Sequence, residues 1–183
     1  MYSKAELIVK YLSKKRVLDI GGSGFGGNNA YEVELAKAWR CVANRVVLDK
    51  NQEADIVADL DKDLPSIRGS NFDITTAFDV LEHLESPLKL LRWVPTEELA
   101  ITLPNAVSSI NRWMESKNNY HLYSFTAHTA RSLLERAGYN VEQTYFIFGK
   151  WSILAKLINC VGSIAPAYVA TGLFMYCRRR KVK

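Results

Sequence analysis

The chain has 183 residues, of which 48% are hydrophobic and 23% charged, and a formal net charge of +5. These values exclude collagen-like and low-complexity chains and indicate one globular domain with a full core, spanning residues 1–183. Three widely separated cysteines show no CxxC or Cys/His spacing, so we expect neither a disulfide framework nor a metal site. This cysteine usage is typical of a reducing compartment and predicts a cytoplasmic protein.

The first half of the chain alternates apolar strands with amphipathic helices. Ser3 and Glu6 form a predicted capping box at the start of the first helix. A glycine-rich turn follows the first strand, and five of the chain's ten glycines lie between residues 21 and 27. Up to residue 105, helices are predicted over 3–13, 28–39 and 81–91, and Pro87 lies in the first turn of the last of these. Strands are predicted over 16–20, 45–49, 54–60, 72–78 and 99–103, and a polar loop over 61–71.

The second half begins with a variable, aromatic-rich segment over 106–125, which contains Trp113 and Tyr123. This segment is interpreted either as a lid over the acceptor or as a hydrophobic patch under a loop. A helix is predicted over 126–137, with Gly138 as its C-cap. Strands are predicted over 141–148 and 173–177. Seven strands alternating with helices predict an α/β fold with a doubly wound, mostly parallel sheet.

An uncharged stretch over 157–176 precedes a basic tail over 178–183. Its length and positive flank are compatible with a membrane span. The preferred interpretation divides it at its glycines and proline into a short helix over 151–160 and a final strand over 171–177. The basic tail is then either a solubilising end or a peripheral contact with a membrane surface.

Acidic residues recur where predicted strands end: Asp19, Asp49, Asp59 and Asp79. The carboxyl ends of the strands in an open parallel sheet line the ligand crevice, so these acids are expected to share one site. Asp49 follows Gly27 by 22 residues, about the offset at which a carboxylate reaches ribose hydroxyls in nucleotide-binding folds. For any single acid, a helix cap or turn role is the alternative.

The segments VLDIGGSG, VVLD, DIVADLDKDLP, FDITTAFDVLEHLESP and ITLPN together resemble a class I S-adenosylmethionine-dependent methyltransferase. The similarity is to the small-molecule branch with a DVLEHL segment, and it covers residues 15–105 and 121–145. It implies a Rossmann-like seven-stranded sheet whose last strand is antiparallel. It also implies transfer of a methyl group from S-adenosylmethionine to an oxygen or nitrogen atom of a small molecule, with S-adenosylhomocysteine as product.

The resemblance also assigns cofactor contacts to individual residues. It implies that Asp19 holds the ammonium group of the cofactor directly or through water, that Asp49 binds the ribose hydroxyls and that Asp59 accepts from the adenine amino group. The remaining implied contacts are the backbone of Gly21, Gly22, Ser23 and Gly24 around the methionine part, Lys50 and Leu60 beside the adenine, and Phe78 and Asp79 beside the methyl group.

Two histidines are candidate catalytic bases: His83 in DVLEHL and His121 in NNYHLYS. Histidine suits a proton transfer because its unperturbed pKa is about 6.5. The alternatives are a loop-supporting role for His83 and a packing role for His121. Glu82 is either structural or orients His83. His128 is expected to face solvent from the helix over 126–137.

Two other functions compete with methyl transfer. Gly22, Gly24 and Gly27 match the G-x-G-x-x-G fingerprint of NAD(P)-binding proteins, but Asp19 would repel a pyrophosphate there. The second alternative is a cofactor-binding or inactive module that acts as a partner or membrane-docking subunit. The expected partner is a small-molecule acceptor, and we do not expect a nucleic acid.

Overall fold

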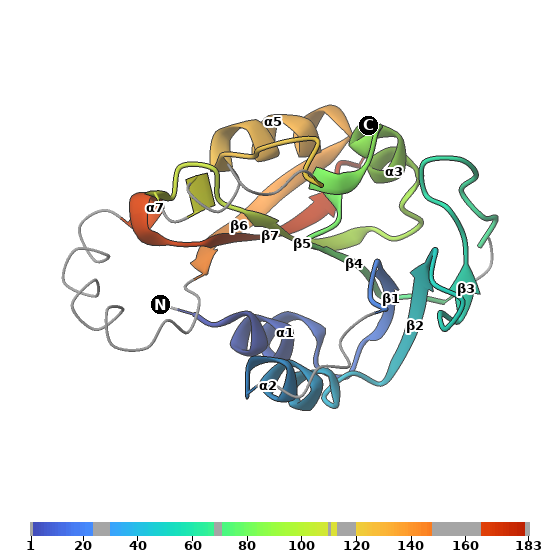
Figure 1. Ribbon diagram of the computed structural model, residues 1–183. Helices are drawn as coiled ribbons and strands as arrows, with labels where there is room; N and C mark the ends of the chain where they lie inside the picture. The colour runs from blue at the N-terminus through green and yellow to red at the C-terminus, as the bar shows by residue number, and fades with distance from the viewer. Residues whose placement is uncertain are drawn as a thin grey trace.

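A seven-stranded sheet forms the centre of the computed structural model, which describes residues 2–23, 30–67, 71–109, 111–112, 120–147 and 166–181 (Figure 1). The strand order is β3-β2-β1-β4-β5-β7-β6, and β7 is antiparallel to both of its neighbours while the others are parallel. This confirms the predicted fold class. The strands are β1 (Arg16–Ile20), β2 (Asn44–Asp49), β3 (Ile56–Val57), β4 (Ile74–Phe78), β5 (Glu98–Pro104), β6 (Tyr139–Ile147) and β7 (Gly172–Arg179).

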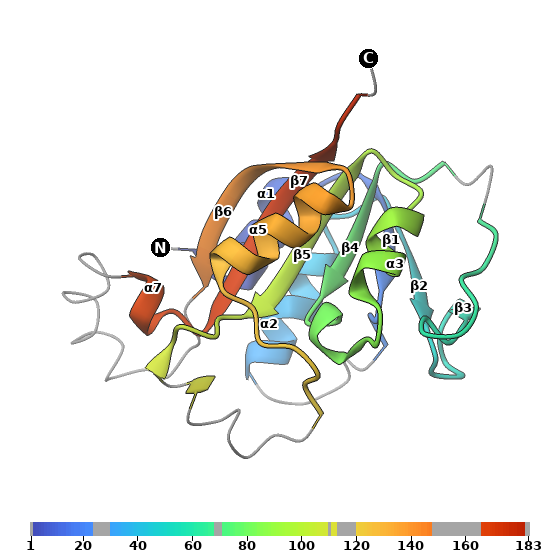
Figure 2. The same ribbon diagram turned by 90° about the horizontal axis from the view of Figure 1, so that it is seen from above.

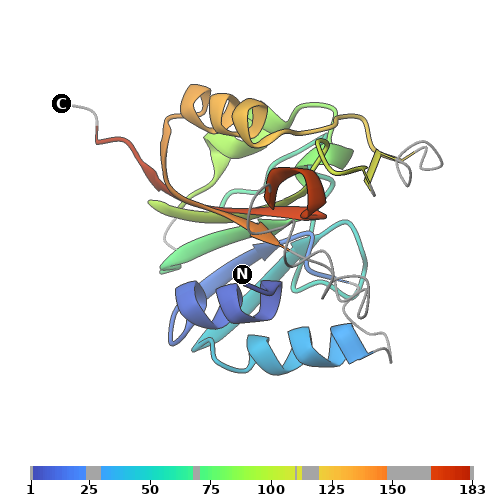
Figure 3. The same ribbon diagram turned by 90° about the vertical axis from the view of Figure 1, so that its left-hand side faces the viewer.

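Helices cover both faces of the sheet. Helices α1 (Lys4–Leu12) and α2 (Ala30–Trp39) lie on one face, and α3 (Pro87–Trp93) and α5 (Ala127–Arg136) lie on the other (Figures 1 and 3). Viewed from above, α3 and α5 lie across the central strands (Figure 2). The short helices η1 (Leu81–His83) and α7 (Pro166–Val169) occupy connections.

Side chains alternate between the two faces along each strand, as the pleat requires. On β7, Phe174 packs toward α1 and α2, whereas Met175 packs toward α3 and α5. On β1, Val17 and Leu18 divide in the same way. Both faces of the sheet are therefore buried, which is typical of a mostly parallel sheet.

Two helix boundaries follow the predicted signals. At α1, the Ser3 hydroxyl accepts from the Glu6 backbone N–H at 3.2 Å, and the Ser3 backbone N–H donates to the Glu6 carboxylate at 2.7 Å. This confirms the capping box. After α5, Gly138 has a φ of +96°, the left-handed conformation that ends helices at glycine.

The predictions over 54–60 and 81–91 were wrong in extent. Strand β3 covers only Ile56 and Val57, because Asp59 accepts from the backbone of the following residues and turns the chain. The helix predicted over 81–91 is two helices, η1 and α3. Pro87 begins α3, and a proline disfavours helical backbone at the preceding residue, here Ser86.

The basic tail predicted over 178–183 begins later than expected, because Arg178 and Arg179 belong to β7. Arg178 pairs with Glu98 at 3.1 Å, and Arg179 donates to the Tyr139 hydroxyl at 2.7 Å. No helix within the part of the chain that the structure describes is both long and apolar enough to cross a membrane. The helix predicted over 151–160 lies outside the described residues, as do Gly24 and Trp113.

Candidate active site

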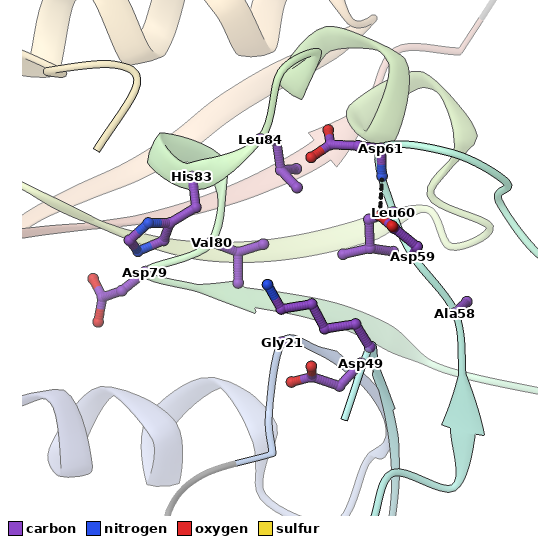
Figure 4. Close-up of a pocket in the computed structure, with 11 residues that line it drawn as sticks. Gly21, Asp49, Ala58, Asp59, Leu60, Asp61, Asp79, Val80, His83 and Leu84 are labelled. Atoms are coloured by element: carbon purple, nitrogen blue, oxygen red, sulfur yellow. Dashed lines mark hydrogen bonds between the residues drawn. The ribbon is translucent and has the colours of Figure 1, made fainter. Parts of the chain in front are cut away.

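A cavity of about 230 Å³ opens at the carboxyl ends of the parallel strands (Figure 4). Gly21 follows β1, Asp49 ends β2, and Asp79 follows β4. Strands β1 and β4 are the neighbours at which the winding direction reverses, the usual position of a ligand crevice. The described lining residues are Gly21, Asp49, Lys50, Ala58, Asp59, Leu60, Asp61, Asp79, Val80, His83 and Leu84.

Bare backbone forms the wall next to β1. Gly21 has a φ of +70°, and its N–H donates to the Leu48 carbonyl at 2.8 Å. A Cβ atom at Gly21 would lie 2.5 Å from Cγ2 of Val80, and one at Gly22 would overlap the Asp19 carboxylate. The close packing therefore requires glycine at both positions, and at Gly21 it leaves peptide backbone facing the cavity.

Two carboxylates stand on the wall formed by β2 and β3. Asp49 accepts from the backbone N–H of Ser23 at 3.2 Å and from that of Asn51 at 3.1 Å, which fixes its side chain. Asp59 accepts from the Asp61 N–H at 3.2 Å, the contact drawn in Figure 4. Its ion pair with Lys62 and this backbone bond lower the pKa of Asp59, so the carboxylate is ionised at neutral pH.

Asp79 has the strained geometry that is common at functional sites. Its φ is +55°, a left-handed conformation that a non-glycine residue adopts only at a free-energy cost. The backbone N–H of Asp79 donates to the Thr102 carbonyl at 3.0 Å. The Thr102 hydroxyl donates to the Asp79 carboxylate at 3.0 Å. Lys4 of α1 pairs with its other carboxylate oxygen at 2.7 Å. Burial lowers the pKa of Lys4, but Asp79, Tyr31 and Asp19 together outweigh it and raise that pKa above the ordinary value.

Asp19 occupies a different environment from the acids at the cavity. Its side chain points to the α1–α2 face and is 1% exposed. Arg45 donates to it from two nitrogens, at 2.8 and 2.5 Å, and Thr76 donates at 2.5 Å. Among the described residues that line the cavity, Asp19 is absent. Phe78 is absent too, because it packs in the core against Trp39 and Phe174.

The two candidate bases lie together. The His83 and His121 rings meet edge to face, with centroids 4.7 Å apart. The backbone carbonyl of Glu82 accepts from the N–H of Leu122 at 2.7 Å and from that of Tyr123 at 3.2 Å, which binds the segment carrying His121 to η1. His128 is exposed on α5, as expected.

The structure thus brings seven of the predicted site residues to one cavity: Gly21, Asp49, Lys50, Asp59, Leu60, Asp79 and His83. Sequence reasoning missed four lining residues: Ala58, Asp61, Val80 and Leu84. Asp61 and Val80 follow closely after predicted strand ends, so extending the predicted site along those loops would have found them. Ala58 was predicted inside a strand and Leu84 inside a helix, so that extension would have missed both.

Comparisons with known proteins bear on the family and the fold of the chain. A family model described as a methyltransferase domain matches residues 3–144. No curated protein sequence matches the chain. Many solved structures do, at low sequence identity, and three of them show the extent of the shared fold.

The first is a SAM-dependent methyltransferase from Archaeoglobus fulgidus, with a TM-score of 0.65, 18% identity, and 96% of this chain and 94% of that chain covered. The second is an S-adenosylmethionine-dependent methyltransferase from Mesorhizobium loti, with a TM-score of 0.56, 16% identity and 92% of each chain covered. The third is the small RNA methyltransferase HEN1, with a TM-score of 0.65, 15% identity, and 98% of this chain and 25% of that chain covered.

Proposed function

The chain belongs to the methyltransferase domain family and uses S-adenosylmethionine as methyl donor, and we propose that it methylates an oxygen or nitrogen atom of a small molecule. The observation that carries the proposal is the shared cavity of Gly21, Asp49, Asp59 and His83. This cavity combines peptide backbone at Gly21, carboxylates that can accept hydrogen bonds and an imidazole.

The residues of the cavity fit the parts of this cofactor. Asp49, fixed by two backbone donors, would accept from the ribose hydroxyls. Asp59 and Leu60 would offer an acceptor and an apolar surface to the adenine. The backbone at Gly21 would lie along the methionine part. Because Asp79 lines the cavity and Asp19 does not, we assign the direct contact with the ammonium group to Asp79, which would share its carboxylate with Lys4, and a supporting role to Asp19.

The charge of the cavity favours a small neutral or cationic acceptor. Among the described lining residues, four carry carboxylates (Asp49, Asp59, Asp61 and Asp79) and one carries an ammonium group (Lys50). Lys4 and Lys62 pair with Asp79 and Asp59 but do not line the cavity themselves, so its lining is mainly acidic. A nucleic acid would bring its phosphate groups close to these carboxylates, and neighbouring negative charges repel each other. A small amine or alcohol meets no such penalty.

When bound, S-adenosylmethionine supplies a methyl group that is attached to a positively charged sulfur. After transfer, that sulfur is part of a neutral thioether. The chain therefore has two tasks, to position the acceptor and to let it lose a proton. His83 lines the cavity and His121 lies next to it, so we assign activation of the acceptor to this pair.

Transfer of radiolabel tests the proposal. The purified chain is incubated with methyl-labelled S-adenosylmethionine and, separately, with the small-molecule, RNA and protein fractions of a cell extract. We expect label in the small-molecule fraction only, and its loss in Asp49→Ala but not in Glu53→Ala, which removes an exposed acid in the connection that follows β2. Label confined to RNA or protein would contradict the small-molecule acceptor. Binding of S-adenosylhomocysteine without transfer to any fraction would indicate an inactive module.

A further inference from the structure

Glu82, His83 and His121 bring three metal-binding side chains to one place beside the cavity. One ligand atom from each residue lies within 4.8 Å of the other two. We propose that these three residues bind a divalent transition-metal ion. The use of that ion in methyl transfer rests on the proposed function, whereas the binding of the ion does not.

The ligand set selects the class of metal. Two imidazoles and one carboxylate suit Zn²⁺, Fe²⁺ or Co²⁺ and leave coordination positions open, whereas Mg²⁺ and Ca²⁺ prefer oxygen ligands alone. With metal–ligand bonds of about 2.1 Å, the ligand atoms of a tetrahedral site lie about 3.4 Å apart. The ligand atoms lie within 4.8 Å of one another, so binding of an ion would require side-chain rotations of the exposed His83 and the half-buried His121 to reach that separation.

Hydrogen bonds around the cluster orient its members. Nδ1 of His83 lies 3.0 Å from the carbonyl oxygen of Tyr120. A carbonyl only accepts, so Nδ1 carries the proton and Nε2 keeps its lone pair for a metal. Histidine ligands in metal sites are commonly oriented in this way. The backbone bonds from Leu122 and Tyr123 to Glu82 hold the two ligand-bearing segments together before any ion binds.

An ion at this place would face the acceptor. His83 is at once a member of the cluster and a wall of the cavity. A hydroxyl group bound to a divalent cation loses its proton more readily, and the proton passes to solvent. The acceptor oxygen then forms its bond to the methyl carbon while the carbon–sulfur bond breaks and its electron pair stays on sulfur. Both histidines are then ligands, and neither needs to be a free base.

Titration with Co²⁺ alone tests the site, because bound Co²⁺ has a visible absorption spectrum that reports its ligands. The tag-free chain is titrated, and Zn²⁺ is added as competitor. We expect one Co²⁺ per chain, displaced by Zn²⁺. The affinity should fall more than about tenfold in His83→Ala and in His121→Ala. His128→Ala, which removes the exposed histidine of α5, should bind Co²⁺ as the wild type does.

Binding of S-adenosylhomocysteine, measured in the same samples, shows that each variant is folded. Co²⁺ affinity that is equal in the wild type and in the double variant His83→Ala/His121→Ala would overturn the metal site, and so would a wild type that shows no Co²⁺ spectrum. The cluster would then be a hydrogen-bonded support for the segment over 120–123. Co²⁺ binding without methylation of any acceptor fraction would keep the site and refute the proposed function.

Discussion

Two nitrogens of the Arg45 guanidinium donate to the same carboxylate oxygen of Asp19, at 2.8 and 2.5 Å. Nη2 of Arg45 also donates to the Gly22 carbonyl at 2.9 Å, and the guanidinium lies 4.4 Å from the centre of the Trp39 ring. The arginine thus neutralises a buried acid, orders the first residues of the glycine turn and packs against α2. One side chain links the core to the wall of the cavity.

Replacing Arg45 by alanine should destabilise the protein strongly. The change leaves the Asp19 carboxylate buried without its cation, and breaking such a pair typically costs about 3–5 kcal/mol. The free energy of unfolding, from urea denaturation, measures this loss. The matched control is Arg16→Ala, which removes the arginine of an exposed pair with Asp73 and should cost at most about 1 kcal/mol. Equal losses in the two variants would mean that Arg45 does not stabilise the buried acid.

The position of Asp19 marks a limit of sequence reasoning. Its place at the end of an apolar strand was predictable, but the face to which it points depends on the pleat, and its partner depends on how β1 and β2 pair. Val47, two residues after Arg45, is the register partner of Asp19. No local pattern encodes that register, so the pairing of Asp19 with Arg45 could not be foreseen.

Most strand ends could be predicted, because apolar runs, glycines and prolines are local signals, although β3 ends at Val57, before Asp59. The cavity follows from them, since parallel strands bring Asp49, Asp59 and Asp79 to one edge. The meeting of His83 with His121 could not be predicted in the same way. The two residues are far apart in sequence, and the contact depends on backbone bonds between Glu82 and the later segment. The expectation that the chain has no metal site considered only cysteine and histidine spacing in the sequence. That spacing does not reveal a cluster whose members come together only when the chain folds.

Replacing Asp49 by alanine should weaken binding of the cofactor. Loss of a charge-assisted contact with the ribose hydroxyls costs about 1–3 kcal/mol, which calorimetry with S-adenosylhomocysteine would show as an increase of about 5- to 150-fold in Kd. Glu53→Ala is the control, since Glu53 is an exposed acid in the connection that follows β2. Unchanged affinity in Asp49→Ala would contradict the assignment of the ribose site.

Asp73 should contribute to stability in a way that depends on pH. Hydrogen bonds from the side chain and backbone of Arg16 lower the pKa of Asp73 to about 2, whereas an unfolded aspartate has a pKa of about 3.9. The contribution is therefore complete above pH of about 4 and is lost as the pH falls through about 2. The Tm of Asp73→Asn should lie below that of the wild type at neutral pH, and the difference should vanish in acid. A difference that persists in strong acid would assign the effect to packing.

Gly21 offers a test of whether the wall of the cavity requires bare backbone. Gly21→Ala adds a methyl group both at a φ of +70° and 2.5 Å from Cγ2 of Val80. Gly138→Ala is the matched control, because its φ is +96° but no heavy atom lies within 4 Å of the added carbon. The free energy of unfolding of the control should fall only by the cost of the left-handed conformation, about 1–2 kcal/mol. In Gly21→Ala it should fall by more.

A double-mutant cycle separates the collision from the backbone strain. Val80→Ala removes the methyl group that Gly21→Ala would strike, so it should destabilise the wild type, as any truncation of a buried valine does, but destabilise the Gly21→Ala variant less or even stabilise it. Unfolding free energies of the four proteins give the coupling. If Val80→Ala costs the same in both backgrounds, the collision does not occur, and the glycine is required for its backbone conformation alone.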